Sequence, residues 1–173
     1  MRFLYQKELS HTVQLHPMYF GPRMQEYVEL RLRAEVEGSC SGRYGYVVAV
    51  LQVNEISRGR VLPNIGLADF HARYTAVVFK PFKGEVEDGI VTTVNKMGFF
   101  ADVGPLQVFV STHLIPADLN YDPNGDQPCY TSEDQLIQKG SLIRLKIVGT
   151  RMDATEIFAI GTIKEDYLGV ISQ

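Results

Sequence analysis

Residues 84–111 have the sequence GEVEDGIVTTVNKMGFFADVGPLQVFVS, and this stretch decides the fold of the second half of the chain. Short apolar and β-branched runs separated by turn residues are typical of consecutive antiparallel strands. Gly98 lies between two of these runs, where a sharp bend needs a glycine, and Asp153-Ala154 between two later runs predicts a hairpin tip. In all, five runs predict strands: 84–95, 99–103, 107–111, 142–152 and 156–163. Five short strands in so few residues predict a small barrel of the OB type.

The first half predicts a different module, one helix on a small antiparallel sheet. Residues 23–37 repeat apolar side chains every four positions, and Pro22 suits the first helical position. A small sheet needs such a cover to be stable. Loops are expected at 57–71 and, in the second half, at 117–134, where aspartate, proline and glycine accumulate. Strands are predicted at 2–15, 46–53 and 73–79.

The pattern changes at Pro81-Phe82-Lys83-Gly84, which predicts an α+β chain of two domains: a helix-on-sheet domain at 1–81 and a barrel domain at 82–173. Charge divides unevenly between the two halves. Residues 1–82 carry 10 Lys/Arg and 7 Asp/Glu (+3), whereas residues 83–173 carry 7 and 13 (−6), which sums to the net −3. A domain that binds RNA mainly by neutralising phosphates is basic. Any RNA contact of the second domain is therefore expected to be weak, local or based on stacking.

The sequence excludes several classes of protein. Hydrophobic residues make up 45% of the chain, yet no apolar run approaches the roughly 20 residues of a membrane span. The N-terminus does not resemble a signal peptide, and two cysteines, Cys40 and Cys129, fit a reducing, intracellular compartment. Neither these cysteines nor the four histidines have metal-site spacing, and no catalytic motif is present. We therefore predict no catalytic residue, no metal and no cofactor.

Aromatic and basic residues come together on the expected barrel strands. On OB barrels this surface holds single-stranded nucleic acid by stacking bases on rings. Phe99 and Phe100 must point to opposite faces, so at least one belongs to the core, and the basic side chains equally suit a solvated strand face. The candidate RNA-binding residues are Lys96, Phe100, Phe109, Arg144, Lys146 and Arg151.

Two loops of the first domain carry apolar residues held by proline and glycine. Exposed apolar tips of this kind suit docking onto a partner, although the same side chains can fold back into their own core. The candidate docking residues are Met18, Tyr19, Phe20, Gly21, Pro22, Val61, Leu62, Pro63 and Ile65.

Several strings along the chain are similar to the RNA polymerase stalk subunit family, in the version that serves polymerase II. They are HPMYFGP (16–22), EGSCSGRYG (37–45), FKPFKGE (79–85), LKIVGTR (145–151), IFAIG (157–161) and DYLG (166–169). The resemblance implies an N-terminal tip domain with a truncated ribonucleoprotein-like fold and an OB barrel of the ribosomal-protein S-one type. It implies a nuclear, non-catalytic subunit, with some cytoplasmic presence, that pairs with the smaller stalk subunit. The tip domain would dock on the polymerase II core near the clamp base, and the barrel would contact nascent single-stranded RNA weakly.

One departure concerns the barrel. RNA-binding barrels of this type resemble the pattern Phe-Gly-x-Phe on the second strand with a histidine on the third. Here Met97 takes the first Phe position, Phe100 is retained, and Val110 stands near the histidine position. Two alternatives remain open: the equivalent stalk subunit of polymerase III, polymerase I or an archaeal-type enzyme, and a free single-stranded RNA-binding OB protein.

Overall fold

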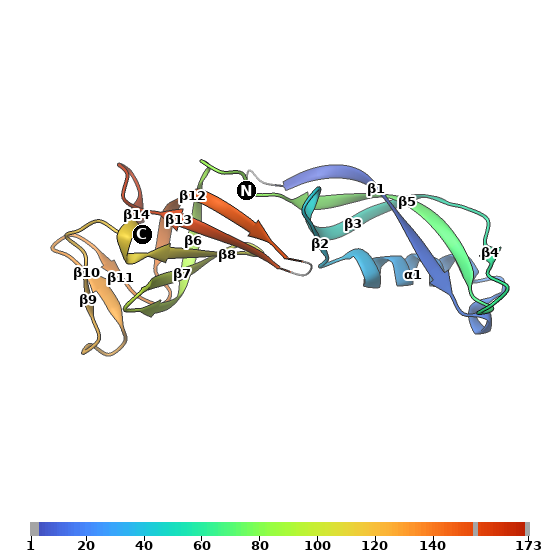
Figure 1. Cartoon of the computed structure of the whole chain (residues 1–173), viewed down its shortest axis with the longest axis horizontal. Coiled ribbons are helices and arrows are strands. Elements are labelled where there is room, and N and C mark those ends of the chain that lie inside the picture. The colour runs from blue at the N-terminus through green and yellow to red at the C-terminus, as the bar shows by residue number, and fades with distance from the viewer. Residues whose placement is uncertain (1–3, 154–155, 172–173) are drawn as a thin grey trace. The chain divides into compact units, whose positions relative to one another are not determined.

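The computed structural model describes residues 4–153 and 156–171, and these divide into two compact units that meet between Lys80 and Pro81 (Figure 1). Of the hairpin tip expected at Asp153-Ala154, the second residue lies outside the described residues, as do the first two of the strand expected at 2–15. Each unit is described by itself.

The N-terminal unit is one helix on an antiparallel sheet, as predicted. The sheet has the order β1-β5-β3-β2, with β4 paired to β5. Its elements are β1 (Leu4–Leu15), η1 (Pro17–Tyr19), α1 (Met24–Val36), β2 (Cys40–Ser41), β3 (Gly45–Ile56), β4 (Arg60–Val61) and β5 (Ala68–Phe79).

The core of this unit lies between α1 and one face of the sheet. Val28, Leu32 and Val36 are buried, as their four-residue spacing predicts. Each fully buried aliphatic side chain contributes about 1.5–3 kcal/mol relative to an exposed one. Pro22 was expected to be the first helical residue, but Arg23 is the N-cap and α1 begins two residues later, at Met24.

Strand β5 begins at Ala68, so the loop expected at 57–71 ends earlier than the sequence suggested. The reason is pairing: Ala68 lies opposite Leu15 on β1 and opposite Val61 on β4. Alternate β5 residues from Ala68 onward point into the core, and the two flanking strands supply hydrogen bonds that local composition does not reveal.

Strand β3 follows a three-residue rather than a two-residue repeat. Its pairing with β5 shifts register three times, between 47/49, 50/52 and 53/55. Each bulge inserts one extra residue, so Val47 and Val50 face the core while the extra residues Val48 and Leu51 are exposed. The strand is consequently longer than the 46–53 run that alternation indicated.

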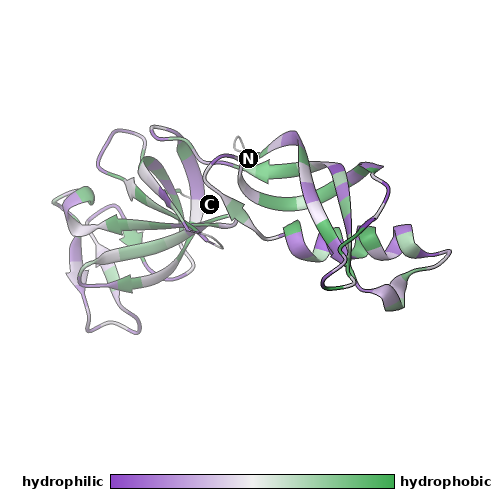
Figure 2. Ribbon diagram, turned by 45° about the vertical axis from the view of Figure 1, so that its right-hand side comes forward, coloured by the Kyte–Doolittle hydropathy of each residue, from purple (hydrophilic) through white to green (hydrophobic). Residues whose placement is uncertain are grey.

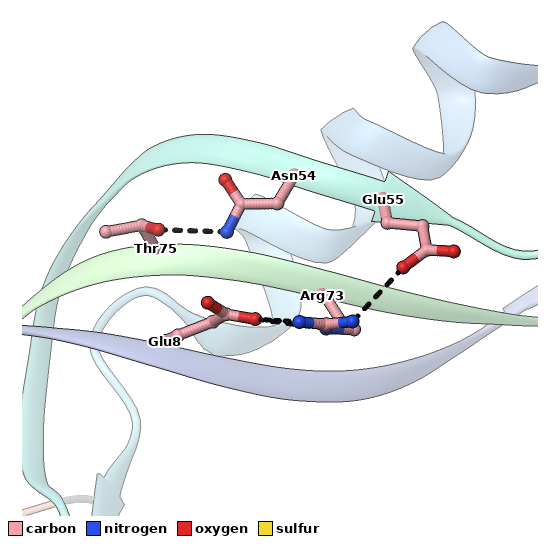
Figure 3. Close-up of polar contacts among 5 residues, drawn as sticks. All are labelled: Glu8, Asn54, Glu55, Arg73 and Thr75. Carbon is pink, nitrogen blue, oxygen red and sulfur yellow. Dashed lines mark hydrogen bonds and ion pairs between the residues drawn. The ribbon is translucent and has the colours of Figure 1, made fainter.

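The sheet face opposite α1 is covered by polar contacts rather than by a second layer (Figure 3). Arg73 on β5 hydrogen-bonds to Glu8 on β1 and to Glu55 on β3, and Asn54 donates to the hydroxyl of Thr75. The hydrogen bond and the charge of Glu8 raise the pKa of Arg73 further above its usual value. These contacts tie the three long strands together on a solvated face.

The C-terminal unit contains a closed five-stranded barrel, also as predicted. In the sheet, the strands lie side by side in the order β6, β7, β8 and β13. Strand β12 pairs with both β6 and β13, and this double pairing closes the barrel. β13 runs parallel to β8, whereas the other barrel pairs are antiparallel. The elements are β6 (Val86–Asn95), β7 (Gly98–Val103), β8 (Leu106–Ser111), η2 (Thr112–Leu114), β9 (Asn120–Asp122), β10 (Cys129–Thr131), β11 (Leu136–Ile137), β12 (Leu142–Met152), β13 (Ile157–Thr162) and β14 (Gly169–Val170).

Alternation along these strands separates the barrel core from its outer face. Figure 2 shows hydrophobic and hydrophilic residues alternating along the strands. Gly98 begins β7 with φ +146°, a backbone conformation that side chains disfavour, so the glycine stands where the bend requires it. The buried side chains that fill the barrel include Phe99, Leu106, Ile143, Leu145, Ile147 and Ile157.

Residues 117–134 are not the polar loop that the sequence predicted. The short strands β9 and β10 lie there and form a separate sheet with β11, which follows shortly after this range. Cys129 and Tyr130 are buried, and the Tyr130 hydroxyl donates a 2.7 Å hydrogen bond to the carbonyl oxygen of Asn95. The buried side chains of Leu119, Cys129 and Tyr130, together with this hydrogen bond, order a segment that its composition marks as a loop.

No helix among the described residues has both the length and the apolar character needed to cross a bilayer.

Candidate RNA-contacting and docking surfaces

The outer face of the barrel carries a row of side chains in register across four strands. Thr93 on β6 pairs with Phe100 on β7, Phe100 with Phe109 on β8, and Phe109 with Ile160 on β13. Cross-strand partners share a face of the sheet, so these four residues form a continuous strip, called here the aromatic row. The ring centroids of Phe100 and Phe109 lie 4.8 Å apart with an angle of 40° between the ring planes, and both side chains are half-buried.

Phe100 and Phe109, two of the residues predicted to contact RNA, lie in register on the outer face of the barrel. Phe99 is fully buried and Phe100 is half-buried, so consecutive residues do point to opposite faces. Val110, expected near the histidine position of the family pattern, is in the core. Phe109 instead takes the outward position beside Phe100, because it is the residue in register on β8.

A second row runs beside the first. Ile90 pairs with Asp102, Asp102 with Gln107, Gln107 with Phe158 and Phe158 with Arg151. We call this the adjacent row. It brings Arg151, a predicted RNA-binding residue, to the same outer face as the aromatic row.

Phe158 and Ile160 of β13 were missed by sequence reasoning. Their exposed fractions are 38% and 50%, although IFAIG (157–161) suggests a wholly buried strand. The signal that could have found them is the period of two: Phe158 and Ile160 alternate with Ile157, Ala159 and Gly161, and only one of these two sets can face a closed barrel core.

The predicted basic residues fall into two groups. Arg144 donates two hydrogen bonds to Asp88, at 2.8 and 3.1 Å, and Lys146 pairs with Glu165 at 2.9 Å. The hydrogen bonds from Arg144 lower the pKa of the Asp88 carboxyl below its ordinary value. Lys96, in the turn between β6 and β7, and Arg151 form no ion pair with any residue that the structure describes.

The candidate docking residues of the N-terminal unit are exposed. Met18 is 72% exposed, Val61 58% and Ile65 59%, and Tyr19 and Phe20 are also exposed, while Leu62 is half-buried. Gly21, Pro22 and Pro63 are exposed as well. For these apolar tips, the alternative of folding back into the core therefore does not hold.

The two candidate loops leave the sheet at the same end. Leu15, which precedes the first loop, pairs with Ala68, and Ala68 pairs with Val61 at the start of the second. A groove of about 390 Å³ adjoins the first loop, where the ring of Tyr19 lies 5.0 Å from that of Tyr27. Its lining residues are Leu15, Tyr19, Tyr27, Leu30, Arg31 and Ala34.

Neither surface holds a candidate catalytic or metal centre. Within the described residues, no three His, Cys, Asp or Glu side chains come close enough together to hold a metal ion. Glu8, Glu55, Asp88 and Glu165 are each engaged by a basic partner on a solvated strand face.

A helix-covered sheet followed by a closed barrel with an aromatic outer row places the chain in the class of two-module proteins that carry an OB-type barrel. Two family models match the two modules: residues 10–66 match "SHS2 domain found in N terminus of Rpb7p/Rpc25p/MJ0397", and residues 80–160 match "S1 RNA binding domain". The chain is 63% identical to "DNA-directed RNA polymerase II subunit rpb7" of Schizosaccharomyces pombe over 95% of this chain and 97% of that protein. It is 53% identical to "DNA-directed RNA polymerase II subunit RPB7" of Glycine max over 95% of this chain and 94% of that protein.

The similarity to a subunit of a different polymerase is lower. "DNA-directed RNA polymerase V subunit 7" of Arabidopsis thaliana is 33% identical over 84% of this chain and 83% of that protein. The chain belongs to the family of RNA polymerase II subunit Rpb7, as the resemblance in its sequence indicated.

Proposed function

We propose that the chain is a non-catalytic subunit of nuclear RNA polymerase II that forms the stalk with the smaller stalk subunit, docks on the polymerase core and contacts emerging RNA. The observation that carries this proposal is the end-to-end identity of 63% with a protein named as an RNA polymerase II subunit. Both modules of the family lie within the matched length.

Docking is assigned to the loops at one end of the N-terminal sheet. Met18, Val61 and Ile65 expose large apolar surfaces in loops at the same end of the N-terminal sheet, and a monomer gains nothing from exposing them. Burying one such side chain in a partner contributes about 1.5–3 kcal/mol. On this proposal the tip loops hold the chain against the core near the clamp base and favour the closed clamp by binding that state more tightly.

The smaller stalk subunit needs a different surface from the polymerase core. The exposed residues Val48 and Leu51, on the bulged strand β3, are candidates for this contact. Beyond its short pairing with β2, β3 is an edge strand, and its bulges discourage pairing with an arbitrary strand. A dedicated partner can nevertheless cover its exposed apolar side chains.

RNA contact is assigned to the aromatic row, with Lys96 and Arg151 as the basic residues beside it. Rings offer a stacking surface to any base, while Arg144 and Lys146 are neutralised by acidic partners. The polymerase would supply a high local concentration of transcript, so a weak site suffices.

A tagged pull-down from the native cell tests the assignment to polymerase II. Recovery of the large polymerase II subunits with one smaller partner is expected; recovery of another polymerase, or of RNA alone, would refute it. The double variant Met18→Ser/Val61→Ser should reduce recovery of the large subunits at least about tenfold, because two apolar anchors are lost. The control Val86→Ser/Val148→Ser removes two exposed apolar side chains from the barrel and should leave recovery unchanged.

Crosslinking to nascent transcript tests the RNA contact in the assembled polymerase. Replacing Lys96, Phe100 and Arg151 together by Ala should weaken crosslinking and leave assembly intact. Unchanged crosslinking would place the RNA surface elsewhere on the polymerase.

A further inference from the structure

We propose that β13 adds a second stacking position to the RNA surface: Phe158, with Arg151 beside it, holds one base of single-stranded RNA next to a base on the Phe100–Phe109 pair. This inference rests on the RNA contact proposed above and extends it to residues outside the predicted site.

Register places Phe158 on the correct face. It pairs with Gln107 on one side and with Arg151 on the other, and both partners are exposed. Ile160, two residues further along β13, pairs with Phe109. Phe158 and Phe109 are therefore diagonal neighbours on adjacent strands, close enough for aromatic side chains to act together on one surface.

The exposure of Phe158 has no explanation in the packing of the barrel. Its neighbours Ile157 and Ala159 are buried and fill the core, so the barrel is complete without it. Other exposed apolar residues of the barrel, such as Val86 and Val148, are aliphatic and offer no flat ring. Phe158 is the aromatic residue that continues the Phe100–Phe109 surface onto the next strand.

Charge favours a base over a phosphate at this position. Asp102 lies on the adjacent row, two strands from Phe158, and disfavours a phosphate there. Arg151, directly opposite Phe158, lacks a carboxylate partner in the described part of the chain. A guanidinium of this kind can bind one phosphate or stack on the face of a neighbouring base.

The consequence is a site whose affinity depends on stacking more than on salt. With Lys96 and Arg151 as the phosphate contacts of the proposed site, log K should fall with log[salt] with a slope of about −0.7 to −1.4. If Arg144 and Lys146 left their acidic partners to join the site, the slope would be about −2.8.

The test uses the full chain and a fluorescein-labelled twelve-nucleotide oligouridine, with fluorescence anisotropy as the readout. Phe158→Ala should weaken binding about fivefold or more, the loss expected for one stacked base. Phe158→Leu keeps an apolar side chain without a ring and should weaken binding similarly, whereas Phe158→Tyr should bind like the parent. Val86→Ala, an equally exposed aliphatic position of the barrel, should change nothing.

The outcomes separate this inference from the proposed function. If Phe100→Ala weakens binding while Phe158→Ala does not, the RNA surface stands and the second position is refuted. If neither variant weakens binding, the proposed RNA contact itself fails. Full binding by Phe158→Leu, or by an oligomer with abasic sites in place of its bases, would refute stacking. Loss of polymerase recovery by Phe158→Ala without loss of RNA affinity would assign the residue to a protein contact instead.

Discussion

Replacing Gly98 by alanine should destabilise the barrel severely, for two reasons. Gly98 has φ +146°, and a non-glycine residue in such a region costs about 1–3 kcal/mol. A Cβ atom at this position would also overlap the carbonyl oxygen of Val110 and lie 2.9 Å from the Cα atom of Ser111. Both are backbone atoms of β8, so β7 and β8 would have to separate. We expect a total loss of about 3–5 kcal/mol, a large part of the stability of a small domain.

Two other glycines of the same unit serve as matched controls. Gly140 has φ +92° but nothing within 4 Å of an added Cβ, so Gly140→Ala should cost only the backbone term, about 1 kcal/mol. Gly149 has neither a positive φ nor a close neighbour, so Gly149→Ala should change the free energy of unfolding by less than about 0.5 kcal/mol.

The assay is urea unfolding of the full chain followed by circular dichroism, fitted with two transitions if the two units unfold separately. Hydrogen exchange in β7 and β8 assigns the loss to the barrel. A loss below about 1 kcal/mol for Gly98→Ala, or one no larger than that for Gly140→Ala, would refute the argument from close approach. The same variant should weaken RNA binding, because the spacing of Phe100 and Phe109 depends on the two strands that it separates.

Two further variants test polar contacts of the same barrel. Asp88→Asn should lower the free energy of unfolding at pH 7 by less than about 1 kcal/mol, because the pair with Arg144 is solvent-exposed. Arg144 lowers the pKa of Asp88, so the charged carboxylate favours the folded state at pH values above its ordinary pKa of 3.8. This contribution to stability disappears as the pH falls below that value. Urea unfolding at pH 7 and pH 3 should therefore show a smaller difference between parent and variant at pH 3. Tyr130→Phe removes the donor to the Asn95 carbonyl and should lower the free energy of unfolding by about 0.5–1.5 kcal/mol in the same assay. Tyr121, on the neighbouring strand, provides the control: an equal loss in Tyr121→Phe would contradict a specific role for that hydrogen bond.

The barrel strands and the helix could be predicted because their cores are set by local periodicity. Leu32 and Phe99 are buried because the period of the helix or strand points their side chains to the core and those of their neighbours away from it. This reasoning needs no knowledge of distant segments. For the tip residues of the two docking loops, the sequence left exposure and burial in the core open, and the structure shows Met18, Val61 and Ile65 exposed.

What remained beyond the sequence depends on contacts between distant segments. The three-residue repeat of β3 arises from bulges against β5, and the start of β5 at Ala68 is fixed by β1 and β4. The small sheet β9–β11 depends on Tyr130 reaching Asn95, 35 positions earlier. Arg144 and Asp88 are 56 positions apart, and only closure of the barrel makes them neighbours.

That last contact changes how the charge of the second domain should be interpreted. Arg144 and Lys146 appeared in the sequence as phosphate contacts, yet in the fold each balances an acidic side chain, so the basic groups left for RNA are few. The −6 of residues 83–173 then opposes long-range attraction of any transcript. A stacking surface operates only over short distances and gains little from steering. On the proposed function this is consistent, because a subunit held beside emerging RNA needs no attraction to find it, and weak, sequence-tolerant stacking allows the transcript to keep moving.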